Sequence, residues 1–248
     1  LIINPDAVEE KYKEVLFLKE TNEHIAFWEG HKYTIKEAQE VSGIKKVVWL
    51  SEFDTIFRLL ACTSDYIYLN SNEHLRARVI VETRDARFIK QVQSNFPLHK
   101  YERITLIMHH LRSIKSDYEV ELIRHACQVT EKAFRRVLKR LKPGVMEFEL
   151  EADITHEFIQ NRCGIAYGSI LASGKNACVL HYTQNNQPCK KGDLILMDFG
   201  AEYCGYASDL TRTIPVSGKF TNRQKQVYSA VKRVMEKATQ MLVPGNLI

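Results

Sequence analysis

Two aspartates, Asp198 and Asp209, lie within two strand-like apolar runs between residues 193 and 216. A hairpin centred between Tyr203 and Cys204 would place the two aspartates directly opposite each other. Opposed carboxylates on a half-buried sheet repel, so they need a shared proton or a cation. A divalent metal removes this conflict, and two metals can share one bridging carboxylate. The spacing therefore indicates a metal site on the hairpin.

The alternative interpretation is that one or both aspartates lie at strand ends and face water, as most pairs at this separation do. The surrounding string favours the metal site: it reads Gly-Asp-Leu-Ile-Leu-Met-Asp-Phe-Gly-Ala-Glu-Tyr and then Gly-Tyr-Ala-Ser-Asp-Leu-Thr-Arg-Thr-Ile-Pro-Val-Ser-Gly-Lys-Phe-Thr. This string closely resembles the metal-binding hairpin of aminopeptidase P, which shares the pita-bread fold with prolidase, creatinase and methionine aminopeptidase. The resemblance implies two divalent ions, with Asp198 chelating one and Asp209 bridging both. Manganese is the expected metal, and cobalt and zinc are the alternatives.

A histidine and a tyrosine upstream of the hairpin are further candidates. Taken alone, His181 in Val179-Leu180-His181-Tyr182 would more often be a core or loop histidine than a catalytic one. The segment resembles the Leu-His-Tyr segment of aminopeptidase P, whose histidine lies beside the substrate. The resemblance implies that His181 is catalytic and binds substrate, either stabilising the carbonyl oxyanion or holding the proline-side carboxyl end. Tyr167 matches a position that lines the same pocket.

The bulk composition narrows the class of protein. The chain has 248 residues, 45% of them hydrophobic, and a net charge of +5 with 26% charged residues. Basic residues are scattered among acidic ones, which disfavours a nucleic-acid partner. The sequence has no apolar run near the roughly 18 residues that span a membrane, and no signal peptide is visible. Six cysteines without a Cys-x-x-Cys pair favour reduced thiols in a cytoplasmic protein.

The first part of the chain alternates strand and helix patterns. We expect strands at 14–20, 47–50 and 66–69, and helices at 34–41, from 51, and at about 72–95. This alternation predicts an α/β domain with a mainly parallel sheet. The domain, placed at residues 1–112, resembles the creatinase-type amino-terminal domain of aminopeptidase P without its opening strands. That domain mediates oligomer contacts in the family, so a homo-oligomer, dimer or tetramer, is implied.

Residues 113–248 resemble the first half of the α+β pita-bread metallopeptidase domain. A capping box from Ser116 to Glu119 begins a long helix that lasts until Pro143, and a second helix follows at about 147–161. The 170–177 stretch is typical of a strand and a turn. Thr221 caps a last helix, whose apolar residues we expect to face inward: Val227, Val231, Val234, Ala238 and Leu242.

Both ends of the chain look cut, because it begins in mid-strand without methionine and stops just after a helix. We expect a piece of a longer protein that lacks the carboxyl-terminal half of the catalytic domain. The family completes the metal shell with one histidine and two glutamates, which we expect beyond residue 248. The 248 residues alone should therefore bind metal weakly and be inactive.

The expected function is that of a metal-dependent aminopeptidase. The resemblance implies a substrate peptide with proline at its second position, cleaved before the proline by a hydroxide that bridges two metal ions. A prolidase-type Xaa-Pro dipeptidase is a close alternative. A non-catalytic pita-bread module that binds peptides or proteins is another, but such modules usually lose ligands in the hairpin, whereas Asp198, Asp209 and His181 are all present.

Overall fold

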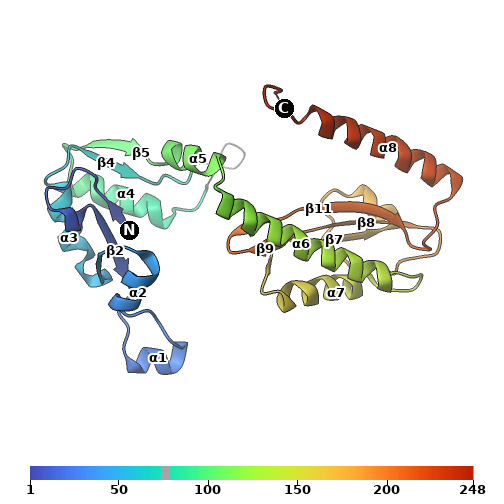
Figure 1. The fold of residues 1–248 in the computed structure, drawn as a ribbon, viewed down its shortest axis with the longest axis horizontal. Helices are drawn as coiled ribbons and strands as arrows, with labels where there is room; N and C mark the ends of the chain where they lie inside the picture. The colour runs from blue at the N-terminus through green and yellow to red at the C-terminus, as the bar shows by residue number, and fades with distance from the viewer. Residues whose placement is uncertain (74–78, 248) are drawn as a thin grey trace. The chain divides into compact units, whose positions relative to one another are not determined.

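The computed structural model describes residues 1–73 and 79–247, which fall into two units, Leu1–Ile114 and Lys115–Ile248. The first unit contains a three-stranded and a two-stranded sheet (Figure 1). Their strands are β1 (Ile2–Ile3), β2 (Glu14–Leu18) and β3 (Lys46–Trp49), then β4 (Tyr66–Leu69) and β5 (Lys100–Arg103). The pairs β2–β3 and β4–β5 are parallel, whereas β1 runs antiparallel to β2. The expected α/β amino-terminal domain is confirmed.

The first unit has five helices in its described residues, and three of them are capped at the amino-terminal end by a side chain. The five helices are α1 (Glu23–Glu29), α2 (Ile35–Ser42), α3 (Phe53–Ala61), α4 (Arg84–Asn95) and α5 (Thr105–Ser113), with 3-10 turns η1 (Glu10–Tyr12) and η2 (Leu50–Glu52). Thr34 forms the capping box of α2, and Gly43 ends that helix in the left-handed conformation. The helix expected from residue 72 is shorter than predicted, because its amino-terminal cap is Thr83; residues 74–78 lie outside the described residues.

The second unit packs two helices on one face of a three-stranded antiparallel sheet (Figure 1). The helices are α6 (Asp117–Arg140) and α7 (Glu147–Gln160), and the sheet has the order β11 (Leu210–Pro215), β8 (Leu194–Phe199), β7 (Ile170–Ser173). A smaller sheet has the order β10 (Tyr206–Ala207), β9 (Ala201–Tyr203), β6 (Gly164–Ile165). The 3-10 turn η3 (Gly174–Cys178) follows β7, and α8 (Asn222–Met241) follows β11.

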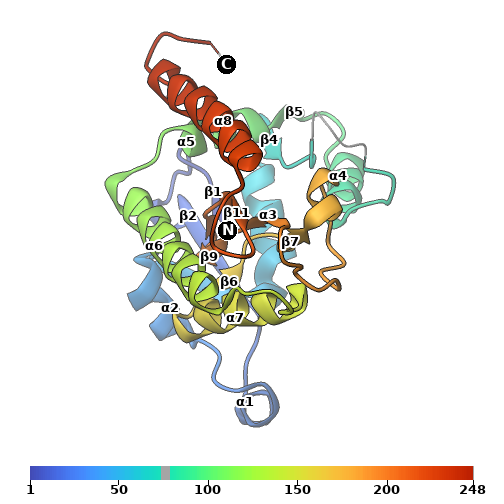
Figure 2. The same cartoon turned by 90° about the vertical axis from the view of Figure 1, so that its right-hand side faces the viewer.

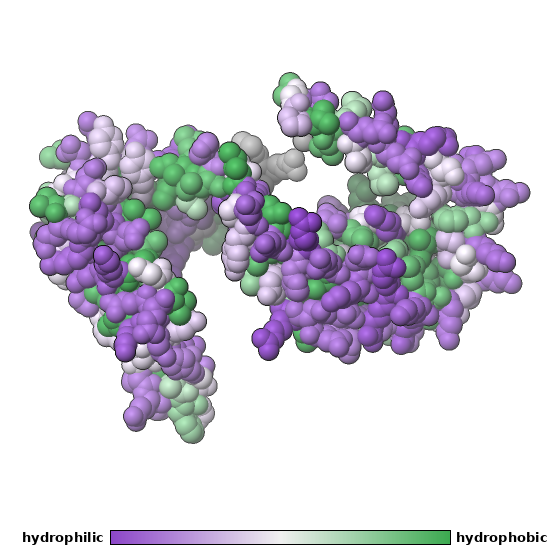
Figure 3. Space-filling model, viewed as in Figure 1, coloured by the Kyte–Doolittle hydropathy of each residue, from purple (hydrophilic) through white to green (hydrophobic). Residues whose placement is uncertain are grey.

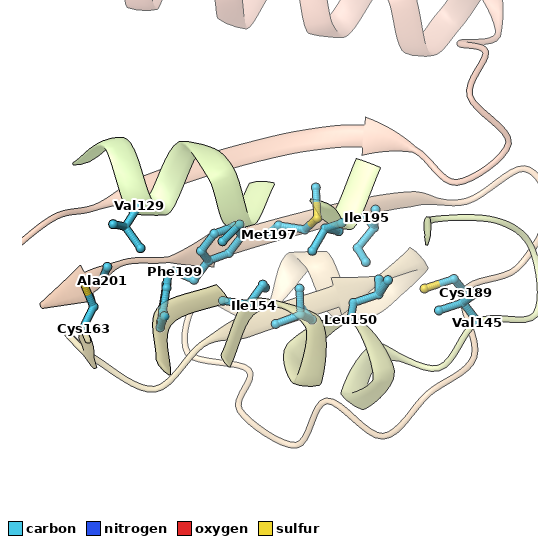
Figure 4. Packing of buried hydrophobic residues seen from close by; sticks show 14 of the residues in the cluster. Val129, Val145, Leu150, Ile154, Cys163, Cys189, Ile195, Met197, Phe199 and Ala201 are labelled. Atoms are coloured by element: carbon cyan, nitrogen blue, oxygen red, sulfur yellow. The ribbon is translucent and has the colours of Figure 1, made fainter. Parts of the chain in front are cut away.

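Strand β8 is the centre of this unit because every second side chain enters the core. Ile195, Met197 and Phe199 are fully buried against apolar residues of α6 and α7 (Figure 4). The outer surface over the two helices is mainly hydrophilic (Figure 3). Each fully buried large apolar side chain stabilises the fold by about 1.5–3 kcal/mol. The alternation that buries these residues turns Asp198 to the opposite face of the sheet.

The last helix, α8, departs from expectation. Its capping box of Thr221 and Gln224 forms as predicted. The predicted inward face is wrong, since Val231 and Val234 are 63% and 70% exposed and no residue of α8 is buried. Figures 1 and 2 show why: α8 lies apart from the sheet and helices of its unit. Neither α8 nor any other helix in the described part of the chain is long and apolar enough to cross a lipid bilayer.

Candidate metal centre

The hairpin that carries both aspartates has a different register from the one predicted. Strand β11 pairs with β8 so that Thr211, not Asp209, lies opposite Asp198. The turn consists of Cys204 and Gly205, whose φ angles of 51° and 82° fit a two-residue type I′ turn. The turn centre therefore lies one residue later than expected, which shifts every pair by two residues.

The two aspartates nevertheless share a face of the sheet. Opposed residues point the same way, so Thr211 lies on the face of Asp198, and Asp209 lies two residues before Thr211. The aspartates are thus diagonal neighbours. Diagonal neighbours on adjacent strands lie about 7–8 Å apart, whereas the Cβ atoms of directly opposed residues lie roughly 4.5–5.5 Å apart. Diagonal placement leaves room for another group between the carboxylates.

The hydroxyl of Tyr167 occupies that place. Its oxygen lies 2.6 Å from Oδ1 of Asp198 and 3.0 Å from Oδ1 of Asp209, so the two carboxylates share one donor. Burial, and then the hydrogen bonds to the two carboxylates, raise the pKa of Tyr167 well above its usual value. The hydroxyl therefore remains a donor at neutral pH and orients both carboxylates.

Gly200 makes this arrangement sterically possible, and the sequence reading did not single it out. A Cβ at this position would lie 1.8 Å from the carbonyl oxygen of Ser208 and 3.2 Å from Cε1 of Tyr167. Only a glycine lets the two hairpin strands and the tyrosine ring approach this closely. A glycine inside a strand pattern is the signal that could have found it.

A buried pair of hydroxyls fixes the strand segment just before Asp209. The Oγ1 atom of Thr130 in α6 lies 2.7 Å from Oγ of Ser208, and it accepts a hydrogen bond from the amide of Ala201 at 2.9 Å. Ser208 Oγ also donates to the carbonyl of Ala201. Buried polar groups are costly unless paired, so this network ties the hairpin to α6. It joins residues 78 and 71 positions apart, a separation that no local pattern reveals.

His181 is the predicted residue that the structure does not join to the others. It lies between η3 and β8 and is exposed to solvent. In the described part of the chain no hydrogen bond links it to Asp198, Asp209 or Tyr167. The structure therefore brings together three of the four predicted residues and leaves the imidazole free to meet another molecule.

The chemistry of the donor set suits a hard divalent cation. The two carboxylates offer only oxygen atoms, which manganese accepts readily as ligands. Within residues 1–73 and 79–247, no three histidine, cysteine, aspartate or glutamate side chains converge on one metal position. The aspartates thus fit part of a metal shell, and further ligands are needed to complete it.

Comparison with known protein families shows which family the chain belongs to. The model of "Metallopeptidase family M24" matches residues 121–248, and that of "Aminopeptidase P, N-terminal domain" matches residues 1–68. The chain belongs to metallopeptidase family M24. This M24 chain is 31% identical to a Haemophilus influenzae Xaa-Pro aminopeptidase over 249 aligned residues, covering 100% of the chain and 55% of the relative. An Escherichia coli Xaa-Pro aminopeptidase is 34% identical, with 94% of the chain and 54% of the relative covered.

Solved structures give the same result. Pseudomonas aeruginosa aminopeptidase PepP superposes with a TM-score of 0.85 at 30% identity. The match covers 98% of the M24 chain and 55% of the Pseudomonas protein. An Escherichia coli aminopeptidase P variant in complex with substrate gives a TM-score of 0.79 at 32% identity. This match covers 93% of the M24 chain and 53% of the Escherichia coli protein. The pita-bread assignment is confirmed. The M24 chain spans about half the length of the curated relatives it matches.

The shared tyrosine donor leads to a testable prediction. Tyr167→Phe removes the hydroxyl that orients both carboxylates and keeps the ring over Gly200. Loss of such an outer partner costs about 10- to 100-fold in metal affinity or activity. We expect a loss of this size in manganese affinity, measured by titration calorimetry on the protein at its full natural length.

Tyr203→Phe is the matched control for this variant. Tyr203 lies in the same hairpin, and in the described residues its hydroxyl makes no hydrogen bond, while its ring packs on His125 with centroids 4.3 Å apart. We expect Tyr203→Phe to bind manganese like the unmodified protein. Equal affinities for the two variants would show that the Tyr167 hydroxyl does not support the metal.

Proposed function

We propose that the protein is a metal-dependent aminopeptidase that hydrolyses the bond between an amino-terminal residue and a following proline. The observation that carries the proposal is the pair Asp198 and Asp209, held on one sheet face by the shared hydroxyl of Tyr167. The similarity of 94–100% of the chain to about half of each protein named Xaa-Pro aminopeptidase supports this specificity.

Asp198 and Asp209 would hold the metal, as a chelating and a bridging ligand of a two-ion site. Two divalent ions, manganese in our proposal, would supply an activated water as nucleophile and polarise the scissile carbonyl. The chain's own contribution is to keep both carboxylates on one face, close enough to share the Tyr167 donor. Their remaining oxygen lone pairs stay available for coordination.

His181 would act on the substrate. Its exposed imidazole can donate a hydrogen bond to the carbonyl oxygen as negative charge develops there, or to the proline-side carboxyl end. Tyr167 would line the same pocket. In the proposed enzyme the hairpin would bind the metal, and the segment before it, which carries His181, would bind the substrate.

A substrate comparison tests the proposal. The protein at its full natural length is stripped of metal with a chelator, reloaded with manganese, and assayed on an Xaa-Pro-Xaa tripeptide beside an Xaa-Pro dipeptide. We expect tripeptide cleavage that is lost with the chelator and restored by manganese. Cleavage of the dipeptide alone would mean a prolidase-type enzyme. No cleavage and no bound metal would mean a peptide- or protein-binding module.

A further inference from the structure

Glu147, the first residue of α7, is a fully buried carboxylate to which metal binding assigns no role. It accepts three hydrogen bonds: Ser173 N to Oε1 at 2.7 Å, and the Tyr182 hydroxyl and Gln187 N to Oε2 at 2.8 and 2.9 Å. In the described part of the chain it forms no ion pair. A buried carboxylate is costly unless its oxygens are hydrogen-bonded, so these donors are what keep Glu147 inside.

Two of the three donors, Ser173 and Gln187, flank the segment that carries His181. Ser173 ends β7, immediately before residues 174–186, and Gln187 follows that segment directly. The base of the segment is closed a second time by the backbone, since Glu147 N donates to the Gln187 carbonyl at 3.0 Å and Cys189 N donates to the Val145 carbonyl at 2.8 Å. Glu147 thus joins both ends of the segment.

The third donor lies inside the segment, next to the histidine. Tyr182 is 8% exposed, and its ring packs in a cluster with Ile170 and Ala172. On the other side of His181, Leu180 is 89% exposed. Fixing the Tyr182 side chain in the interior therefore determines where the backbone presents the His181 imidazole.

Asn185 provides a separate anchor on the same segment. It is 2% exposed and has a φ of 45°. Its side chain accepts from Leu171 N at 2.9 Å, and donates to the Ser169 carbonyl at 2.8 Å and to Oε2 of Glu151 at 2.9 Å. The end of the segment is therefore held without Glu147, so loss of the Glu147 contacts should loosen the segment rather than unfold the unit.

We propose that Glu147 is a positioning residue for the peptidase reaction: through the Tyr182 hydroxyl it holds His181 where the substrate carbonyl or carboxyl group is bound. This inference rests on the function proposed above for His181. Small misplacements of a reacting group lower rates strongly, by up to about 100-fold for 1 Å. A tether of this kind therefore affects the rate even when the fold is intact.

Two substitutions break the tether in different ways. Tyr182→Phe removes only the hydroxyl and keeps the packed ring. Glu147→Gln keeps the shape, but its NH₂ group must face either Ser173 N or Gln187 N, so one donor opposes another in both amide orientations. Tyr101→Phe is the matched control, because it removes a tyrosine hydroxyl that bonds to the Phe96 carbonyl in the first unit.

The test is a double-mutant cycle on the metal-loaded protein at its full natural length. We expect Tyr182→Phe and Glu147→Gln each to lower kcat/KM for the Xaa-Pro-Xaa tripeptide by roughly tenfold, and Tyr101→Phe to leave it unchanged. In a His181→Ala background both should change kcat/KM by less than about twofold, because the group they position is gone. The same factor in both backgrounds would mean a purely structural role and would overturn the proposal.

Amide hydrogen exchange separates this proposal from the proposed function. Glu147→Gln should raise exchange in residues 174–186 by about tenfold or more and leave α6 unchanged. Unchanged exchange in the segment refutes the tether, whatever the activity. Raised exchange in a protein whose activity is absent, or is insensitive to His181→Ala, confirms the tether but refutes its catalytic purpose, and then the proposed function of His181 fails.

Discussion

We expect Asp209→Asn to lower the proposed peptidase activity of the manganese-loaded protein at its full natural length by more than about 100-fold. Even residues that only orient a metal ligand are worth about 10- to 100-fold, and this change removes the charge of a proposed bridging ligand. Asparagine keeps the size of the side chain and an oxygen that can accept a hydrogen bond from the Tyr167 hydroxyl. In the unmodified protein this hydroxyl lies 3.0 Å from Oδ1 of Asp209. The loss would therefore reflect coordination rather than packing.

Initial rates on an Xaa-Pro-Xaa tripeptide, with metal content measured on the same samples, check this result. Asp117→Asn is the control, because Asp117 is an exposed aspartate in the first turn of α6. It should keep full activity. If Asp209→Asn kept both its metal and its rate, the hairpin would not be the metal centre.

Gly200→Ala is expected to have the largest effect on stability. Its Cβ would overlap the Ser208 carbonyl oxygen, at 1.8 Å, and the carbonyl carbon, at 2.7 Å. The Ser208 backbone cannot retreat without breaking the hydrogen bond from its N–H to the Ala201 carbonyl, at 2.9 Å, and the buried contact of its hydroxyl with Thr130. We expect a destabilisation of more than about 4 kcal/mol, the range reached when a substitution disrupts the backbone and a buried network together.

Chemical denaturation followed by circular dichroism measures this difference, with Gly168→Ala as the matched control. At Gly168 the nearest atom to an added Cβ is Cγ2 of Thr183, at 3.9 Å, an ordinary van der Waals distance. The control should lie within about 1 kcal/mol of the unmodified protein. Similar unfolding midpoints for the two variants would disprove the steric argument.

Local signals in the sequence predicted where three of the helices begin. The capping boxes at Thr34, Ser116 and Thr221 involve residues three positions apart, and all three begin a helix in the structure. The apolar run before Asp198 also predicted a strand, which is β8 in the structure. Such signals work because the interacting groups are close in the chain.

The register of the hairpin could not be predicted from the same signals. It depends on Cys204, a residue that rarely adopts positive φ, taking the first position of the turn. Gly205 alone is compatible with several turn centres, and a shift of the centre by one residue moves every pair by two. Because side chains alternate between the two faces, a pairing shift of two residues keeps each residue on its predicted face. The prediction that places Asp198 and Asp209 on one face was correct only for this reason.

Contacts between distant residues were also beyond local patterns. Tyr167 reaches carboxylates 31 and 42 positions away, and the donors to the Glu147 carboxylate lie 26 to 40 positions away. The sequence showed Glu147 only as the start of a helix. Likewise, the period of apolar residues in α8 shows which face is apolar, and it does not show what covers that face.

The most direct test of the metal centre is anomalous diffraction at the manganese absorption edge, on crystals of the manganese-loaded protein at its full natural length. The proposed two-ion site predicts two anomalous peaks beside the hairpin, with an Asp198 oxygen coordinating one ion and the Asp209 carboxylate touching both. Active crystals whose anomalous peaks lie away from both carboxylates would contradict it.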